Sequence, residues 1–90
     1  MLERKFKIIN LTGIDARNSS ILVTECSKFT AEIKLHFSNA SVNLKSIMGV
    51  MSLDIHKGDI VKISFSGVDE AEALEEISYL IDDLKLGKEY

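Results

Sequence analysis

The segment Ala31–Phe37 constrains the fold more than any other stretch of this sequence, because its polar and apolar residues alternate without a break. A period of two sends successive side chains to opposite faces, so it predicts a β-strand with one buried face. Ser38 and Asn39 then form a plausible two-residue turn, and the chain returns through Ser41–Asn43. Together these residues predict a β-hairpin.

Two further segments alternate in the same way. Lys5–Ile8 and Val61–Phe65 each predict a half-buried strand. Asn10–Gly13 interrupts the chain after the first of them, and Asp54–Asp59 is expected to be a polar turn that leads into the second. The chain therefore contains four predicted strands, each with one apolar face.

Two longer helices are predicted from residues at helical spacing. The first begins at Asp15 and ends at Lys28, with an inner stripe made of Ser19, Leu22, Val23 and Cys26. The second follows an acidic capping signature at Asp69–Glu72 and is expected to close at Gly87. Its inner face consists of Ala73, Leu74, Ile77, Leu80, Ile81 and Leu84.

This order of elements, with a short helix after Ser46, predicts an α+β open-faced sandwich. The prediction is a four-stranded antiparallel sheet with three helices on one face. The 90 residues allow one small domain, residues 1–90, and the 46% hydrophobic content is enough for its core.

Charge and cysteine content narrow the class of protein. A net charge of −3 without a long basic run argues against nucleic acid as the main partner. Cys26 is the only cysteine, which fits a reducing cytosol, and neither a signal peptide nor a membrane span is recognisable. His36 and His56 lack metal-ligand spacing to other ligand residues. We expect a cytoplasmic protein that has no metal or other cofactor and binds neither nucleic acid nor membrane directly.

The stretch Asn43–Leu53 carries the strongest indication of function. Ser46 occupies an N-cap position, where its hydroxyl can accept a hydrogen bond from the first turn of a short helix. The apolar residues that follow are too many for so short a helix to bury: Ile47, Met48, Val50 and Met51. Gly49 costs about 1 kcal/mol relative to Ala inside a helix, which suggests either close packing against a neighbour or a partner that needs room there.

The run Lys45–Leu53 (Lys-Ser-Ile-Met-Gly-Val-Met-Ser-Leu) resembles the regulatory-serine region of HPr, the small phosphocarrier protein of the bacterial sugar phosphotransferase system. Gly13–Arg17 resembles the HPr active-site loop, except that Asp15 stands where the family has its phosphorylated histidine. Asn18 stands where the family usually has proline. The resemblance covers essentially residues 1–90 and implies an HPr-like fold, of the type of the catabolite-repression HPr-like proteins that also lack the histidine.

For Ser46 the residues alone leave two interpretations, a plain N-cap or a phosphorylation site. The resemblance implies the second: phosphorylation by an ATP-dependent HPr kinase/phosphorylase, after which the phosphoprotein acts as corepressor for a LacI-type catabolite control protein. Phosphate at this position adds nearly two negative charges beside free N–H groups, so the fold can tolerate it while the charge of the neighbouring apolar surface changes.

Asp15 has three interpretations. It is an N-cap, a permanent mimic of the phosphorylated histidine, or itself a phosphoryl acceptor. A negative charge at this position could weaken the interactions with kinase and repressor. Arg17 matches the family residue that assists the phosphoryl group. It can equally be a solvated charge, a partner of Asp15, a contact to an acidic group of another protein, or a ligand of phosphate on Ser46 of a partner-bound surface.

Ile47, Met48 and Met51 match the family's apolar docking surface, and the alternative is that they belong to the core. At least one of them is expected to anchor the short helix. We expect Ile47 and Met48 to contact a partner and leave Met51 open.

The function expected from these residues is regulatory, in a phosphoacceptor protein that is not an enzyme. Two alternatives remain. The first is a phosphocarrier that uses Asp15 and works with enzyme I and sugar-specific phosphotransferase components. The second is an interaction module that is never modified.

Overall fold

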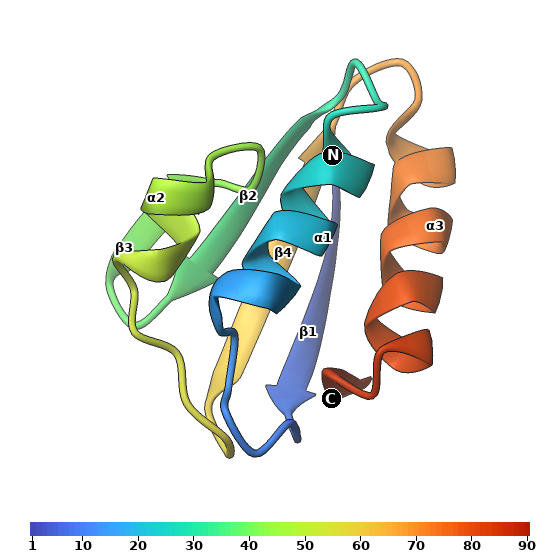
Figure 1. The fold of residues 1–90 in the computed structure, drawn as a ribbon. Helices are drawn as coiled ribbons and strands as arrows, with labels where there is room; N and C mark the ends of the chain where they lie inside the picture. The colour runs from blue at the N-terminus through green and yellow to red at the C-terminus, as the bar shows by residue number, and fades with distance from the viewer.

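The structure is a computed structural model that describes all of residues 1–90. It consists of one five-stranded antiparallel sheet, with three helices packed on the same face (Figure 1). The strands are β1 (Leu2–Ile8), β2 (Glu32–Phe37), β3 (Ala40–Asn43), β4 (Ile60–Ser66) and β5 (Gly87–Glu89). The helices are α1 (Ala16–Cys26), α2 (Ile47–Met51) and α3 (Glu70–Asp83). The strand order is β3-β2-β4-β1-β5, and none of the helices is long and apolar enough to cross a bilayer.

The predicted α+β open-faced sandwich is confirmed, but the predicted number of strands is wrong. β5 pairs antiparallel with the outer edge of β1, where Lys88 lies opposite Lys7 and Gly87 opposite Ile8. The backbone N–H of Tyr90 extends this pairing by donating to the carbonyl of Lys5 at 2.9 Å. The sheet therefore has five strands instead of four.

The end of α3 also differs from the prediction, because Gly87 does not close the helix. Leu84 is the C-cap, and Lys85 adopts the left-handed conformation with φ of 53°. The N–H of Leu86 donates back to the carbonyl of Ile81 at 3.0 Å, which completes the helix end. Gly87 instead starts β5, where a Cβ would lie 3.0 Å from the carbonyl oxygen of Lys7. The glycine is used for close strand pairing and not for a helix cap.

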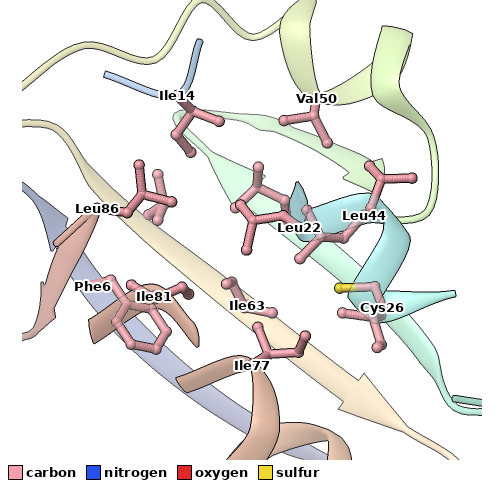
Figure 2. Close-up of a cluster of buried hydrophobic side chains, with 14 of the residues drawn as sticks. Phe6, Ile14, Leu22, Cys26, Leu44, Val50, Ile63, Ile77, Ile81 and Leu86 are labelled. Atoms are coloured by element: carbon pink, nitrogen blue, oxygen red, sulfur yellow. The ribbon is translucent and has the colours of Figure 1, made fainter. Parts of the chain in front are cut away.

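The inward-facing residues of the sheet and helices form one apolar core (Figure 2). Ile33 and Leu35 on β2 and Ile63 and Phe65 on β4 are all nearly inaccessible to solvent. The predicted inner stripe of α1 is confirmed, since its four residues Ser19, Leu22, Val23 and Cys26 are all buried. Burial raises the pKa of the Cys26 thiol to about 12, so this cysteine is a neutral packing residue.

The turn predicted between the two strands of the hairpin is confirmed. The predictions for the turn before β4 and for the start of α3 were incomplete. Ser38 and Asn39 connect β2 to β3, with Ser38 at φ of 57°. The polar turn before β4 contains Ile55, which is buried in the core. Asp69 lies at the N-cap position of α3, but its carboxylate does not cap that helix. It accepts hydrogen bonds from the backbone N–H groups of Thr30 and Ala31 and so ties α3 to the start of β2.

Candidate functional site

The loop that leads into α1 is held by short-range hydrogen bonds and by one glycine. The amide of Asn10 donates to the hydroxyl of Thr12 and to the carbonyl of Gly13, both at 2.9 Å. Gly13 has φ of +67°, and a Cβ there would overlap the carbonyl oxygen of Ile55. That carbonyl accepts from the N–H of Ile14 at 3.2 Å. Only glycine therefore lets the loop approach the Ile55 backbone this closely.

Asp15 is the N-cap of α1, as one of the three interpretations predicted. Its Oδ1 accepts from the backbone N–H of Asn18 at 2.9 Å, and its Oδ2 accepts from the hydroxyl of Thr12 at 2.7 Å. These hydrogen bonds, led by that from Asn18, hold the pKa of the Asp15 carboxyl below its ordinary value. The side chain is therefore a negative charge at neutral pH, and both of its oxygens already have donors.

Arg17 lies in the first turn of α1 and is exposed. It makes no salt bridge, so of its several interpretations a direct ion pair with Asp15 is not observed. Arg17 makes only a minor contribution to the lowered pKa of Asp15. Both residues line a shallow pocket of about 310 Å³, together with Asn10, Thr12, Asn18, Ile21 and Leu84.

Ser46 is the N-cap of α2, and its Oγ accepts from the N–H of Gly49 at 3.1 Å. The carbonyl of Ser46 accepts the first intrahelical bond, from the N–H of Val50 at 3.0 Å. The close packing around residue 49 favours glycine, because a Cβ there would lie 3.2 Å from Ser46 Oγ and 3.5 Å from Val42 Cβ. The absence of a side chain at residue 49 therefore leaves the Ser46 hydroxyl uncrowded.

The apolar residues of α2 divide sharply between core and solvent. Val50 is 1% exposed and attaches the helix to the core, as Figure 2 shows. Met48 is 85% exposed, Ile47 42% and Met51 45%. The expectation that one of these three anchors the helix is wrong, because Val50 performs that role. Ile47, Met48 and Met51 form a continuous stretch of accessible apolar surface, here called the α2 patch.

α1 and α2 lie side by side on the helical face of the sheet, and the colours of Figure 1 show that they run in opposite directions. Their two N-caps, Asp15 and Ser46, are therefore at opposite ends of the pair. The structure brings Asp15 and Arg17 to one pocket and Ser46 to the α2 patch. Sequence reasoning missed Thr12 as the second donor to Asp15. The only available signal was a hydroxyl residue three positions before the cap.

Comparison with known proteins shows which family this chain resembles. The family model described as PTS HPr component phosphorylation site matches residues 2–83. The histidine-containing phosphocarrier protein of Mycoplasma is 32% identical, with a TM-score of 0.93, over 96% of this chain and 98% of that chain. HPr-C-His of Thermoanaerobacter tengcongensis is 42% identical, with a TM-score of 0.88, over 92% of this chain and 93% of that chain.

A third similar structure is Crh, a catabolite repression protein of Bacillus subtilis that crystallised as a domain-swapped dimer. It is 36% identical, with a TM-score of 0.73, over 92% of this chain and 95% of that chain. The matches thus include both histidine-containing phosphocarriers and a protein of catabolite repression.

Proposed function

Because the chain belongs to the HPr family, we propose that it is a regulatory member whose phosphoryl acceptor is Ser46. The resemblance found in the sequence, to HPr and to the catabolite-repression type, is confirmed. In this proposal an ATP-dependent HPr kinase/phosphorylase modifies Ser46, and the histidine phosphocarrier step is lost. The protein is then a cytoplasmic phosphoacceptor and not an enzyme.

The observation that supports this proposal most strongly is the position of Ser46 beside an accessible apolar surface. Its Oγ would attack the γ-phosphorus of ATP, the bond from that phosphorus to the β–γ bridging oxygen would break, and ADP would leave. The hydroxyl proton would pass to a base on the kinase. The phosphate would stand at the start of α2, where the first N–H groups have no partner within the helix and one of them, that of Gly49, already donates to Ser46 Oγ.

The position of Ser46 beside the α2 patch explains how phosphorylation would change the binding of a partner protein. Unmodified, the α2 patch offers Met48 and its neighbours as an exposed apolar surface next to the neutral hydroxyl of Ser46. Phosphorylated, the patch gains a dianion that a basic partner side chain can bind with charge-assisted hydrogen bonds. We propose that a LacI-type catabolite control protein is this partner, and that Arg17 contributes a cationic contact.

The geometry of Asp15 argues against the phosphocarrier alternative. Both carboxylate oxygens accept hydrogen bonds, and its lowered pKa keeps the group ionised and engaged as a cap. Phosphorylation at Asp15 would have to break at least one of these bonds. We therefore propose that Asp15 keeps a permanent negative charge where the family carries phosphohistidine.

A binding experiment tests the proposal. The kinase-treated and untreated proteins are titrated into the LacI-type protein by isothermal calorimetry, and only the phosphorylated form should bind tightly. Met48→Glu should remove that binding, since it places a charge in the α2 patch, whereas Val68→Glu should not, because Val68 is an equally exposed residue far from α2 in the sequence. Equal affinity before and after phosphorylation would contradict the regulatory proposal.

A further inference from the structure

The face of the sheet opposite the helices carries a row of cationic and hydrogen-bond-donating side chains. The register places Lys5 of β1 opposite Lys62 of β4, Lys62 opposite His36 of β2, and His36 opposite Ser41 of β3. Inward-facing Phe6 and Leu35, which neighbour members of this row, are buried in the core. Because successive side chains alternate in a strand, all four row residues lie on the open face.

This arrangement costs stability, because like charges directly opposite each other on neighbouring strands repel. Lys5 faces Lys62 in this way, and on the adjacent strand pair Lys7 faces Lys88. Lys62 is partly compensated by Glu3, whose carboxylate lies 3.4 Å from its amine. No carboxylate lies within 4 Å of the amines of Lys5, Lys7 or Lys88. In a chain of net charge −3, this face is thus locally cationic, and only Lys62 of these four lysines has an acidic partner.

A surface pocket coincides with the row. Its volume is about 430 Å³, within the range of about 300–1,000 Å³ typical of small-molecule sites. Lys5, Lys62 and His36 form one side, and the β2–β3 hairpin adds the hydroxyls of Ser38 and Ser41 and the amide of Asn39. The lining contains no acidic residue. Because two lysines and several hydrogen-bond donors line the pocket and no carboxylate does, the pocket favours an anion over a cation.

His36 responds to the same electrostatic environment. Its Nε2 lies 2.8 Å from the hydroxyl of Ser64 on the neighbouring strand. Burial, followed by the charge of Lys62 and then that of Lys34, lowers its pKa, and Glu3 opposes this effect. A bound anion would reverse the sign of the local field and raise the pKa of His36. The pKa of His36 can therefore be measured to detect anion binding at the row.

We propose that this pocket on the open face binds a small phosphate-bearing anion through Lys5, Lys62, His36 and the hairpin donors. The site lies on the face of the sheet away from α1 and α2 (Figure 1), so a ligand here and a protein on the α2 patch can be bound at the same time. The inference does not depend on phosphorylation of Ser46.

Inorganic pyrophosphate is a suitable probe because it carries two linked phosphates and little else. Titration into isotopically labelled protein, followed by amide and histidine-ring NMR, should give saturable shifts confined to the segments that line the pocket, which are Lys5, residues 36–41 and residues 60–62. The pKa of His36 should rise on saturation. A parallel titration with sodium chloride at matched ionic strength should give neither result. Identical shifts with both salts would overturn the proposal, since they would show charge screening only.

Variants separate the site from the general charge of the protein. Lys5→Gln removes one cation of the row without breaking a salt bridge and should weaken pyrophosphate binding about tenfold. Its thermal midpoint should stay the same or rise, because repulsion with Lys62 is relieved. Lys57→Gln, in the turn before β4, should bind as tightly as the unmodified protein. Equal weakening by both variants would overturn the proposal. So would a short single-stranded DNA that binds more tightly and extends the shifts to Lys7 and Lys88, because the face would then be a polyanion surface.

Discussion

The starts of α1 and α2 have the same capping geometry but different chemistry. At α1, the Asp15 carboxylate accepts two hydrogen bonds and carries a permanent charge. At α2, the Ser46 hydroxyl accepts one hydrogen bond and is neutral. The comparison shows that an N-cap can be made by a charged carboxylate or by a neutral hydroxyl, and in our proposal only the hydroxyl gains a charge later.

The residues around the two caps also differ, because polar residues surround Asp15 and exposed apolar residues follow Ser46. The Asp15 cap is hydrogen-bonded to its own polar loop, in which Asn10 and Thr12 are hydrogen-bonded to each other. The Ser46 cap opens a five-residue helix that exposes Met48 and is attached to the core by Val50. The first site therefore has its hydrogen bonds satisfied within its own loop, whereas the second lies beside exposed apolar surface.

The largest effect on stability should come from the single anchor of α2. Val50→Ala removes two buried methyl groups and should lower the free energy of unfolding by about 2–3 kcal/mol. Met48→Ala should change it by less than about 0.5 kcal/mol, because Met48 is exposed. Urea denaturation of both variants measures the difference. A loss of similar size at Met48 would mean that the α2 patch is part of the core.

The caps themselves should have smaller effects. Ser46→Ala removes the acceptor for the Gly49 N–H and should cost about 1 kcal/mol. Ser46→Asp restores an acceptor at the N-cap and should recover most of that loss. Ser20→Ala, at an exposed position within α1, is the matched control and should not destabilise the protein. If Ser46→Ala were as stable as the unmodified protein, the hydroxyl would contribute nothing as a cap.

The smallest expected effect on stability comes from removing the charge of Asp15 while keeping its role as a cap. Asp15→Asn keeps a good capping side chain but removes the charge. Because folding lowers the pKa of Asp15, the charge stabilises the native state above the ordinary pKa of 3.8 and that contribution is lost as pH falls through the lowered value. The stability difference between the unmodified protein and Asp15→Asn should therefore shrink below about pH 4.

Thermal unfolding of the unmodified protein and Asp15→Asn from pH 7 to pH 2 checks this expectation. Asp83→Asn, an exposed carboxylate at the end of α3, serves as the control and should show no comparable convergence. A difference between the unmodified protein and Asp15→Asn that stays constant with pH would show that the hydrogen bonds of Asp15 do not depend on its charge.

The features that could be predicted from sequence are those with a local cause. The alternation in Ala31–Phe37 and the N-caps at Asp15 and Ser46 depend on residues within a few positions of one another, and all three are confirmed. β5 could not be predicted in this way, because Gly87–Glu89 has no alternation of its own and is defined by pairing with β1.

Features whose geometry depends on tertiary contacts were harder to predict, both in the candidate site and elsewhere. The local pattern predicts Asp69 as a helix cap, but the N–H groups of Thr30 and Ala31, far away in sequence, take its carboxylate. α2 has only five residues, so its sequence is too short to show a helical repeat that would identify Val50 as the buried residue. The cationic row that contains Lys5 and Lys62 exists only through the register of four strands.

The most direct test of the contrast between the two caps is the intact mass of the protein after exposure to two phosphoryl donors. One sample contains ATP and HPr kinase, and the other contains phosphoenolpyruvate and enzyme I. We predict one added phosphoryl group in the first sample only, and none in that sample for Ser46→Ala. Phosphorylation in the enzyme I sample that is lost in Asp15→Ala would contradict the account, because Asp15 would then be a carrier and not a fixed charge. Phosphorylation in neither sample would contradict it as well, and would leave the α2 patch as a surface for constitutive binding.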